Sequence, residues 1–494
     1  MTRAGDLPTL DPPSFEVFRR EAHAMLDRMI DHIEQVPAGP VWQPMPPEVR
    51  GAFAAPLPRG ETPFTEVHAE FERLVVPFTV GNTHPRFLGW VHGGGTPYGM
   101  IAELLAAGLN ANVGGRDHAP VEVERQIVRW MRELFGFPGT ATGIIVTGTS
   151  IANLFAVLVA KTKRLGRDTR VRGLIGEPTR LVAYTSDAAH SCVLRAMELS
   201  GLGSAALRRI PFARDHRMET AVLRETIRRD RAAGLTPFLV VGTAGTVDVG
   251  AIDDLATIAA VAKEEELWFH VDGAFGSLAI LSPELAPKLA GLELADSLAF
   301  DFHKWGQVPY DAGFLLVRDG EAHRAAFASE AAYLTREARG VAAGEPWFAD
   351  YGADLSRGFR ALKVWFTLKT FGIDRLGATI AETCRLARVL EARVAGEPLL
   401  ELLAPVALNI VCFRVRHEEA TVADRLNREL VIDLQESGIA VPSTTRIDGK
   451  LAIRVAIVNH RCRERDLEIL VDAIVARAAP GGAHVIHDSS SLAR

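Results

Sequence analysis

The sequence has few cysteines and few lysines, and it has no long run of basic residues. Its four cysteines are far apart and form no Cys-x-x-Cys pair, which argues against a disulfide framework and a zinc site. Lys and Arg total 55 against 61 Asp and Glu, a net charge of −6. The chain therefore lacks the basic footprint of a nucleic-acid-binding protein. We expect no metal ion and no nucleic acid as partners, and we expect a reducing, cytoplasmic location.

The sequence predicts neither a membrane-spanning segment nor a targeting segment. The 25 uncharged residues of 136–160 include Pro, Gly, Thr, Ser and Asn, so they predict a strand, a turn and a buried helix and no membrane span. The N-terminal residues lack the apolar core of a signal peptide and predict no export. Neither a P-loop ending in Gly-Lys-Ser/Thr nor the dinucleotide fingerprint Gly-x-Gly-x-x-Gly occurs.

The 494 residues, 48% of them hydrophobic, are enough to bury a large core. Short apolar runs alternate with helical patterns, which is typical of an α/β fold with a mostly parallel sheet and helices on both faces. The predicted strands are 143–147, 180–185, 238–243, 267–272, 296–301 and 313–318. Polar or Gly-rich residues follow most of them, so we expect a ligand crevice at the carboxyl ends of the strands.

Changes in pattern along the chain suggest four parts. Residues 1–95 form an N-terminal segment with a helix over 14–38 and a Pro-rich stretch after it. Residues 96–373 form the large α/β domain, and 374–480 form a smaller α+β domain. The Gly- and Ser-rich tail, 481–494, predicts a flexible end.

Lys304 stands apart from the other seven lysines, which lie in ordinary polar or amphipathic surroundings. It follows an apolar strand and is flanked by His303 and Trp305. Partial desolvation there would make the ammonium lose its proton more readily, as a lysine that forms a Schiff base requires. Taken alone, the tripeptide favours a surface lysine that ends a strand.

Asp272 ends another strand whose other residues are mostly apolar. A carboxylate in this place either caps a helix or pairs with a buried cation. In enzymes that use pyridoxal 5′-phosphate (PLP), an Asp keeps the pyridine nitrogen protonated and so makes the ring an electron sink. With Lys304 at the end of a neighbouring strand, we favour the cofactor role for Asp272.

Two further turns join a strand to a helix. The segment GIIVTGTSIANLF places the hydroxyls of Thr149 and Ser150 at a helix start, where they form either a phosphate cup or a plain helix cap. His190 follows a strand and either makes local hydrogen bonds or stacks on a cofactor ring. The Gly-rich segment WVHGGGTPYG predicts a loop at the substrate entrance.

The ordered motifs THPRFLGW, SDAAHSCVLRA, GTAGTVDVGAIDD, FHVDGAFG, ADSLAFDFHKW and SRGFRALKVW resemble a known family. They are similar to those of the PLP-dependent group II amino acid decarboxylases, the fold type I family of aromatic-L-amino-acid and glutamate decarboxylases. The resemblance runs from about residue 14 to residue 475. It implies a PLP-dependent transferase-like fold with a small C-terminal α+β domain.

The resemblance also implies roles for individual residues. Lys304 would hold PLP as a Schiff base, Asp272 would pair with the pyridinium nitrogen, and His190 would stack on the ring. Four residues would bind the phosphate, namely Thr149, Ser150, Ser297 and His303. Ala274 would lie against the face of the ring, where only a small side chain fits.

On the substrate side, the resemblance implies a role for Arg357 at the substrate carboxylate or its surroundings. Trp90 and His92 are further candidates for substrate binding, in an entry segment that is less aromatic than in the aromatic decarboxylases. With Arg116, they suit a polar or larger amino acid equally well. Tyr333, in the segment that corresponds to the family's mobile loop, would protonate Cα of the quinonoid intermediate after CO2 leaves. One departure concerns Asp301-Phe302, which stands where the family usually has a neutral pair before His-Lys and brings an added carboxylate near the phosphate.

The reaction implied is decarboxylation of an L-amino acid to its amine and CO2. Two alternatives remain open at this point. One is a PLP-dependent aldehyde-forming oxidative decarboxylase-deaminase or carbon–carbon lyase on the same scaffold, and the other is a PLP-binding protein without catalysis. The family resemblance further implies a homodimer with active sites at the subunit interface.

Overall fold

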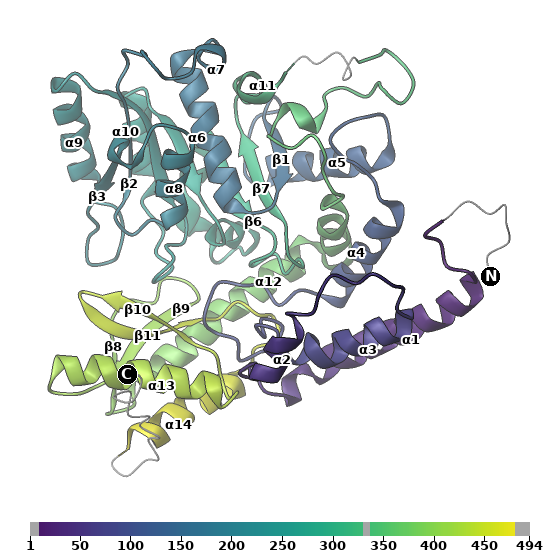
Figure 1. Cartoon of the computed structure of the whole chain (residues 1–494). Coiled ribbons are helices and arrows are strands. Elements are labelled where there is room, and N and C mark those ends of the chain that lie inside the picture. Colours follow the sequence, from purple (N-terminus) through teal and green to yellow (C-terminus); the bar gives the residue numbers. More distant parts are fainter. Residues whose placement is uncertain (1–8, 330–335, 480–494) are drawn as a thin grey trace.

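The computed structural model describes residues 9–329 and 336–479, and its largest element is a seven-stranded sheet (Figure 1). The strand order is β1-β7-β6-β5-β4-β2-β3. Strand β7 runs antiparallel to both neighbours, and the other neighbouring strands are parallel. The strands are β1 Thr142–Val146, β2 Leu181–Ser186, β3 Leu207–Ile210, β4 Thr236–Thr243, β5 Trp268–Asp272, β6 Ser297–Asp301 and β7 Gly313–Val317.

Helices cover both faces of this sheet, as the apolar strands require. On β5, Trp268, His270 and Asp272 share one face because side chains alternate along a strand. That face carries α6, while the opposite face, with Phe269, packs against α10. Helices α8 and α11 pack beside α6. These helices are α5 Ala119–Leu134, α6 Thr149–Leu165, α8 Ser191–Leu199, α9 Thr220–Ala232, α10 Leu255–Glu264 and α11 Gly320–Phe327.

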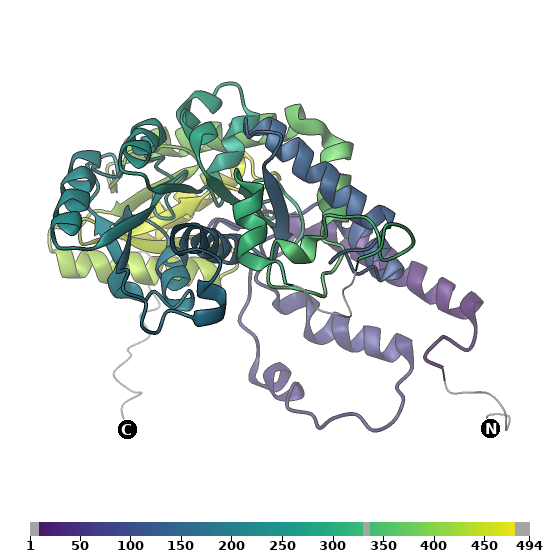
Figure 2. The same ribbon diagram turned by 90° about the horizontal axis from the view of Figure 1, so that it is seen from above.

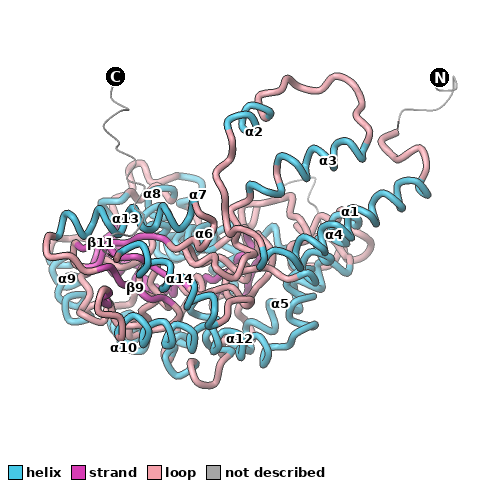
Figure 3. The backbone as a smooth tube through the Cα atoms, turned by 90° about the horizontal axis from the view of Figure 1, so that it is seen from below, coloured by secondary structure: helices cyan, strands magenta, loops and turns pink. Residues whose placement is uncertain are grey.

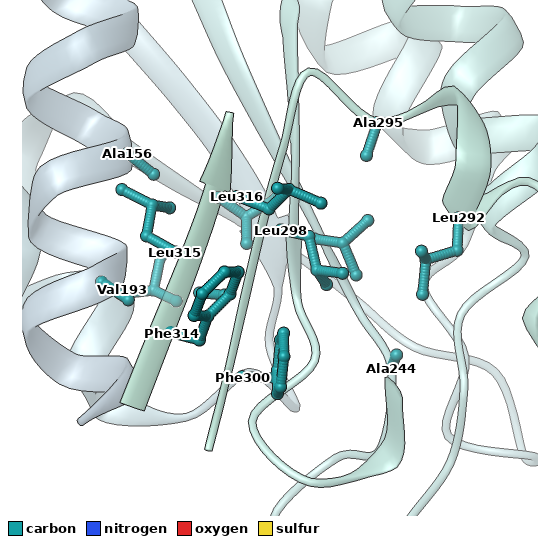
Figure 4. Close-up of a cluster of buried hydrophobic side chains, with 14 of the residues drawn as sticks. Ala156, Val193, Ala244, Leu292, Ala295, Leu298, Phe300, Phe314, Leu315 and Leu316 are labelled. Carbon is teal, nitrogen blue, oxygen red and sulfur yellow. The ribbon is translucent and has the colours of Figure 1, made fainter. Parts of the chain in front are cut away.

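The core of the large domain lies between the sheet and these helices. Figure 4 shows part of it, where Phe300 and Leu298 of β6 lie beside Phe314 and Leu316 of β7. All four side chains are fully buried. This packing fixes the position of β6, the strand that leads into the turn of Lys304.

A second, four-stranded sheet forms the smaller C-terminal unit. Its order is β10-β11-β9-β8, and all its neighbouring strands are antiparallel. Helix α12 (Ala361–Ala395) links the two units and bends at Gly372, whose φ of 68° is left-handed. The other elements are β8 Leu400–Leu402, β9 Ile410–Val415, α13 Ala420–Glu436, β10 Ser443–Ile447, β11 Lys450–Ala456 and α14 Glu464–Ala478. Together the two sheets confirm the predicted fold class.

The N-terminal helices project from the body of the molecule, as Figures 1, 2 and 3 show from three sides. They are α1 Phe15–Gln35, α2 Pro47–Ala52 and α3 Phe64–Leu74, followed by α4 Pro97–Leu109. No side chain of α1 is buried. Residues 86–89 return to the body, where the Leu88 N–H donates to the carbonyl of Val441 at 2.9 Å.

Candidate active site

The polar residues that follow the strands of the large sheet line one cavity of about 350 Å³. It lies at the carboxyl ends of β1, β4, β5 and β6, where the sequence predicts a crevice. Its walls also receive residues from the loop 90–92 and from the small domain. The lining residues are Trp90, Val91, His92, Thr147, Gly148, Thr149, Ser150, His190, Cys192, Thr243, Gly245, Val247, Asp272, Ala274, Phe275, Asp301, His303, Lys304, Tyr310 and Arg454.

Lys304 lies in the turn after β6, and its Nζ is 2.9 Å from Oδ2 of Asp301. Burial by itself lowers the pKa of Lys304, but the Asp301 carboxylate and its hydrogen bond raise it above the ordinary value. This corrects the expectation from the sequence that Lys304 loses its proton readily. In this structure Lys304 is the cation of an ion pair with the buried Asp301, and its own side chain is partly exposed to the cavity.

Asp301 also occupies the start of α6. Its Oδ1 accepts a hydrogen bond of 2.7 Å from the Thr149 backbone N–H, where the partial positive charge of the helix favours an anion. The Thr149 hydroxyl is buried and has no hydrogen-bond partner within the described residues. A phosphate group would satisfy this donor, and Ser150 stands beside it at the cavity wall.

Asp272 and His190 face the same cavity from β5 and from the start of α8. Asp272 is 2% exposed, and its Oδ1 accepts from the Ala274 N–H at 3.2 Å. The His190 ring accepts from the Cys192 N–H at 3.2 Å and so caps α8. The local hydrogen bond considered for His190 is therefore present, and the ring lines the cavity as well.

Two predicted site residues lie elsewhere. Ser297 is at the opposite end of β6 from Asp301, fully buried, and its hydroxyl contacts Trp268 and His270. The predicted phosphate contact of Ser297 is therefore wrong, because Ser297 is the first residue of β6 and the cavity edge lies at the last residue, Asp301.

Arg357 is the second correction. Its guanidinium is 4% exposed and bonds both oxygens of Glu124 at 3.1 and 2.6 Å, together with the carbonyls of Val113 and Ile145. Through these contacts the buried Arg357 links the segment before α12 to α5 and β1. It does not line the cavity, so a contact with the substrate carboxylate is not supported.

The cavity wall opposite the sheet is aromatic. His92 lies edge-on to Tyr310 at 5.4 Å between ring centroids, and Trp90 lies 6.2 Å from His92. Burial, then the charges of Lys304 and His303, lower the pKa of His92 to about 4, so the ring is neutral. The Gly93 N–H donates to the His303 carbonyl at 3.0 Å and ties this loop to the Lys304 turn.

Several lining residues were missed from the sequence, among them Cys192, Tyr310 and Arg454. Arg454 lies on β11 of the small domain, and it donates to the carbonyls of Val247 and Gly89. Nothing in its local sequence links it to a site about 150 residues earlier. Tyr333 lies outside the described residues, and its role stays a prediction.

The residues that line this cavity suit PLP. The cavity offers an amine for an aldehyde, a buried carboxylate for a ring nitrogen, and an unpartnered hydroxyl at a helix start for a phosphate. Within residues 9–329 and 336–479 no group of His, Cys, Asp and Glu is arranged to hold a metal ion. No helix in those ranges is both long and apolar enough to cross a bilayer. Fold and site together define a PLP-dependent enzyme of fold type I.

The chain belongs to the pyridoxal-dependent decarboxylase family, whose conserved domain matches residues 46–416. An aromatic-L-amino-acid decarboxylase of Bacillus atrophaeus is 32% identical, over 94% of this chain and 96% of that protein. The crystal structure of Oryza sativa TDC with PLP and tryptamine superposes with a TM-score of 0.86 at 27% identity, over 95% of this chain and all of that one. Rhodiola rosea 4-hydroxyphenylacetaldehyde synthase superposes with a TM-score of 0.83 at 26% identity, over 94% and 98% of the two chains. The protein is a PLP-dependent amino acid decarboxylase, a carboxy-lyase.

Proposed function

We propose that the substrate is an aromatic L-amino acid, which the enzyme converts to the corresponding amine and CO2. The observation that carries this proposal is the aromatic wall of Trp90, His92 and Tyr310 on the cavity that also contains Lys304 and Asp272. A neutral His92 stacked among rings favours an apolar, planar side chain over a charged one. The similarity to aromatic decarboxylases supports the same choice.

In this proposal each residue has one task. PLP, when bound, supplies an aldehyde that captures amines and a ring that accepts the electrons of the bond to the departing carboxylate. Lys304 is the amine that holds the cofactor, and Asp272 keeps a proton on the pyridine nitrogen. The hydroxyls of Thr149 and Ser150 donate to the phosphate, and the imidazole of His190 covers the ring.

The rest of the cavity orients the substrate and excludes water. Ala274 leaves room for the ring beside Asp272, and His303 lies behind the Lys304 turn, where its Nδ1 accepts from the Ala312 N–H at 3.1 Å. Trp90 and Tyr310 cover the substrate side chain. Tyr333, by resemblance, returns a proton to Cα of the product and so favours amine over aldehyde.

The test is an assay of the PLP-loaded enzyme with tryptophan, tyrosine, phenylalanine, histidine and glutamate, scored for amine, CO2, aldehyde and peroxide. We expect amine and CO2 from at least one aromatic substrate and loss of turnover in Lys304→Ala. Aldehyde with peroxide or ammonia would identify the oxidative alternative. Absence of any product from the whole panel would identify a PLP-binding protein without catalysis and overturn the proposal.

We propose further that the enzyme works as a homodimer in the cytoplasm, with the N-terminal helices packed on the partner. Helix α1 has 21 residues and no buried side chain. Its exposed residues include large apolar ones, since Phe15 is 62% and Phe18 40% exposed. An isolated helix with an uncovered apolar face is marginal in water, so a covering surface is required. The four buried free cysteines suit a reducing compartment.

Light scattering of the purified enzyme tests the dimer. We expect a mass of about twice 53.6 kDa and a shift toward the monomer in Phe18→Asp. The matched control is Arg19→Asp, which changes charge at a neighbouring exposed position without removing an apolar side chain. A monomeric, active wild-type enzyme would contradict the proposal.

A further inference from the structure

A row of buried polar side chains lies behind Asp272, away from the cavity. Asn153 of α6, His270 of β5 and Ser297 of β6 are each at most 1% exposed, and Trp268 is 9% exposed. Strand register brings them together: His270 stands opposite Ser297 in the β5–β6 pair, and Trp268, His270 and Asp272 share one face of β5. Burying a polar group without a hydrogen-bond partner costs free energy, so each of these side chains is expected to have a partner.

The hydrogen bonds form one unbroken chain. Trp268 Nε1 donates to Ser297 Oγ at 2.8 Å, and Ser297 Oγ lies 2.8 Å from His270 Nδ1. His270 Nε2 lies 2.8 Å from Asn153 Oδ1, and Asn153 Nδ2 donates to Asp272 Oδ2 at 3.1 Å. Every separation is within the usual range for a hydrogen bond.

The direction of this chain follows from its ends. An indole N–H can only donate and an ionised carboxylate can only accept. Asn153 must therefore turn its NH2 group toward Asp272 and its carbonyl toward His270, which requires the His270 proton on Nε2. His270 Nδ1 is then an acceptor of the Ser297 hydroxyl proton, and Trp268 donates to the same hydroxyl oxygen. The Ser297 carbonyl oxygen, 3.2 Å from His270 Nδ1, receives no proton from the ring in this tautomer. The opposite tautomer would place the Asn153 carbonyl against the Asp272 carboxylate.

The remaining neighbours of Asp272 are neutral. Cys192 Sγ lies 3.7 Å from Asp272 Oδ2 and 3.1 Å from Asn153 Nδ2, and burial raises the pKa of its thiol. Burial likewise lowers the pKa of His270 to about 4, so its ring is uncharged at neutral pH. Within the described ranges, no Lys, Arg or His nitrogen lies within 4 Å of the Asp272 carboxylate. The Asp272 carboxylate therefore acts on Lys304 only from beyond 4 Å, and it has room for a closer cation brought into the cavity.

From this geometry we infer that Trp268, Ser297, His270 and Asn153 form a positioning relay that holds the Asp272 carboxylate in place and aimed at the pyridine nitrogen of PLP. The inference rests on the proposed role of Asp272 and goes beyond it, because it assigns a function to residues that touch neither cofactor nor substrate. Through the relay, the protonation of the cofactor nitrogen depends on the amide of Asn153. Ser297, which the sequence suggested for the phosphate, would belong to this relay.

The experiment measures the protonation of the cofactor directly. Enzyme loaded with PLP labelled with ¹⁵N in the ring is examined by NMR, and the PLP dissociation constant and the kcat and KM are measured on the same samples. We expect a protonated nitrogen in the wild type and a shift toward the unprotonated resonance in Asn153→Leu. PLP should bind roughly tenfold more weakly, as loss of one hydrogen bond to a charged group implies. The kcat should fall more than the KM rises.

Controls separate the relay from a general loss of packing. Tyr184→Phe removes another fully buried hydrogen bond, to Asp230, and should leave the ¹⁵N resonance and PLP affinity unchanged. Ser297→Ala removes only one hydroxyl, so it is the second test variant if Asn153→Leu does not fold. It should shift the ¹⁵N resonance in the same direction as Asn153→Leu.

Two failures are distinguishable. A ¹⁵N resonance and a PLP affinity unchanged in folded Asn153→Leu or Ser297→Ala would overturn the relay alone. Failure of borohydride to fix PLP on Lys304 of the wild type would overturn the proposed site, and the relay with it.

Discussion

At the scale of single residues, the unusual group in this site is Asp301, which bonds both Lys304 and the start of α6. Replacing Asp301 with Asn removes the charge that holds Lys304 protonated. Burial, the largest influence on Lys304, is then opposed only by the smaller effects of Asp272 and Cys192, so the pKa of Lys304 should fall. We predict that the apoenzyme of Asp301→Asn captures PLP at a pH at least about one unit lower than the wild type does. The measurement is the pH dependence of the rate at which borohydride-trapped PLP accumulates on Lys304.

Asp472→Asn is the matched control for this prediction. The Asp472 side chain is 69% exposed and pairs with Arg393 on the surface of the small domain, far in sequence from the site. Its pH profile should match that of the wild type. An unchanged profile in Asp301→Asn would show that Asp301 does not control the proton on Lys304.

The residues differ in how well the sequence predicts them, and the difference has a physical cause. Lys304, Asp272 and Thr149 follow the carboxyl ends of strands, and all three line the cavity. Ser297 stands at the beginning of its strand, so the same rule predicts a position away from that edge. Arg357 could not be placed this way, because its partner Glu124 is more than 200 residues away in the chain.

At the scale of elements, α6 and β7 meet through two glycines. A Cβ on Gly313, the first residue of β7, would lie 2.4 Å from Cα of Gly148, the residue before α6. We predict that Gly313→Ala pushes the start of α6 away from the sheet, lowers stability by about 1–3 kcal/mol as overpacking does, and weakens PLP binding about tenfold or more. Equilibrium dialysis with PLP and thermal unfolding measure the two effects.

The matched control for Gly313→Ala is Gly139→Ala, because a Cβ added at Gly139 would meet no atom within 4 Å. It should leave both PLP affinity and stability close to those of the wild type. Wild-type PLP affinity in Gly313→Ala would mean that the approach of β7 to α6 does not shape the phosphate site.

The sequence predicts the strands that are buried on both faces, but it does not predict the charged edge strand or the direction of β7. The six predicted apolar runs overlap β1, β2, β4, β5, β6 and β7. Strand β3, whose sequence is LRRI, lies at the edge of the sheet and exposes arginine, so its pattern is not that of a buried strand. The antiparallel direction of β7 was also missed, because an apolar run carries no information about direction.

At the scale of the whole molecule, the large number of buried neutral histidines links stability to pH. Burial lowers the pKa of His270 to about 4 and that of His323 to about 3. The pKa values of His84, His92 and His460 are lowered to about 4 in the same way. In the unfolded chain each would titrate near 6.5. Below that pH these histidines bind protons in the unfolded state but stay neutral in the folded state. The free energy of unfolding therefore falls as the pH drops from about 6.5 toward 4.

We predict that His323→Gln reduces this acid sensitivity. The His323 ring is fully buried and bonds Thr142 and the carbonyl of Tyr351, both of which a glutamine amide can also engage. Removing one such histidine should decrease the slope of unfolding free energy against pH by about 1.4 kcal/mol per pH unit between about pH 4 and 6. Urea unfolding at several pH values across that window measures the slope. His417→Gln, at an exposed position, should keep the wild-type slope, and equal slopes in the two variants would show that His323 is not held neutral by burial.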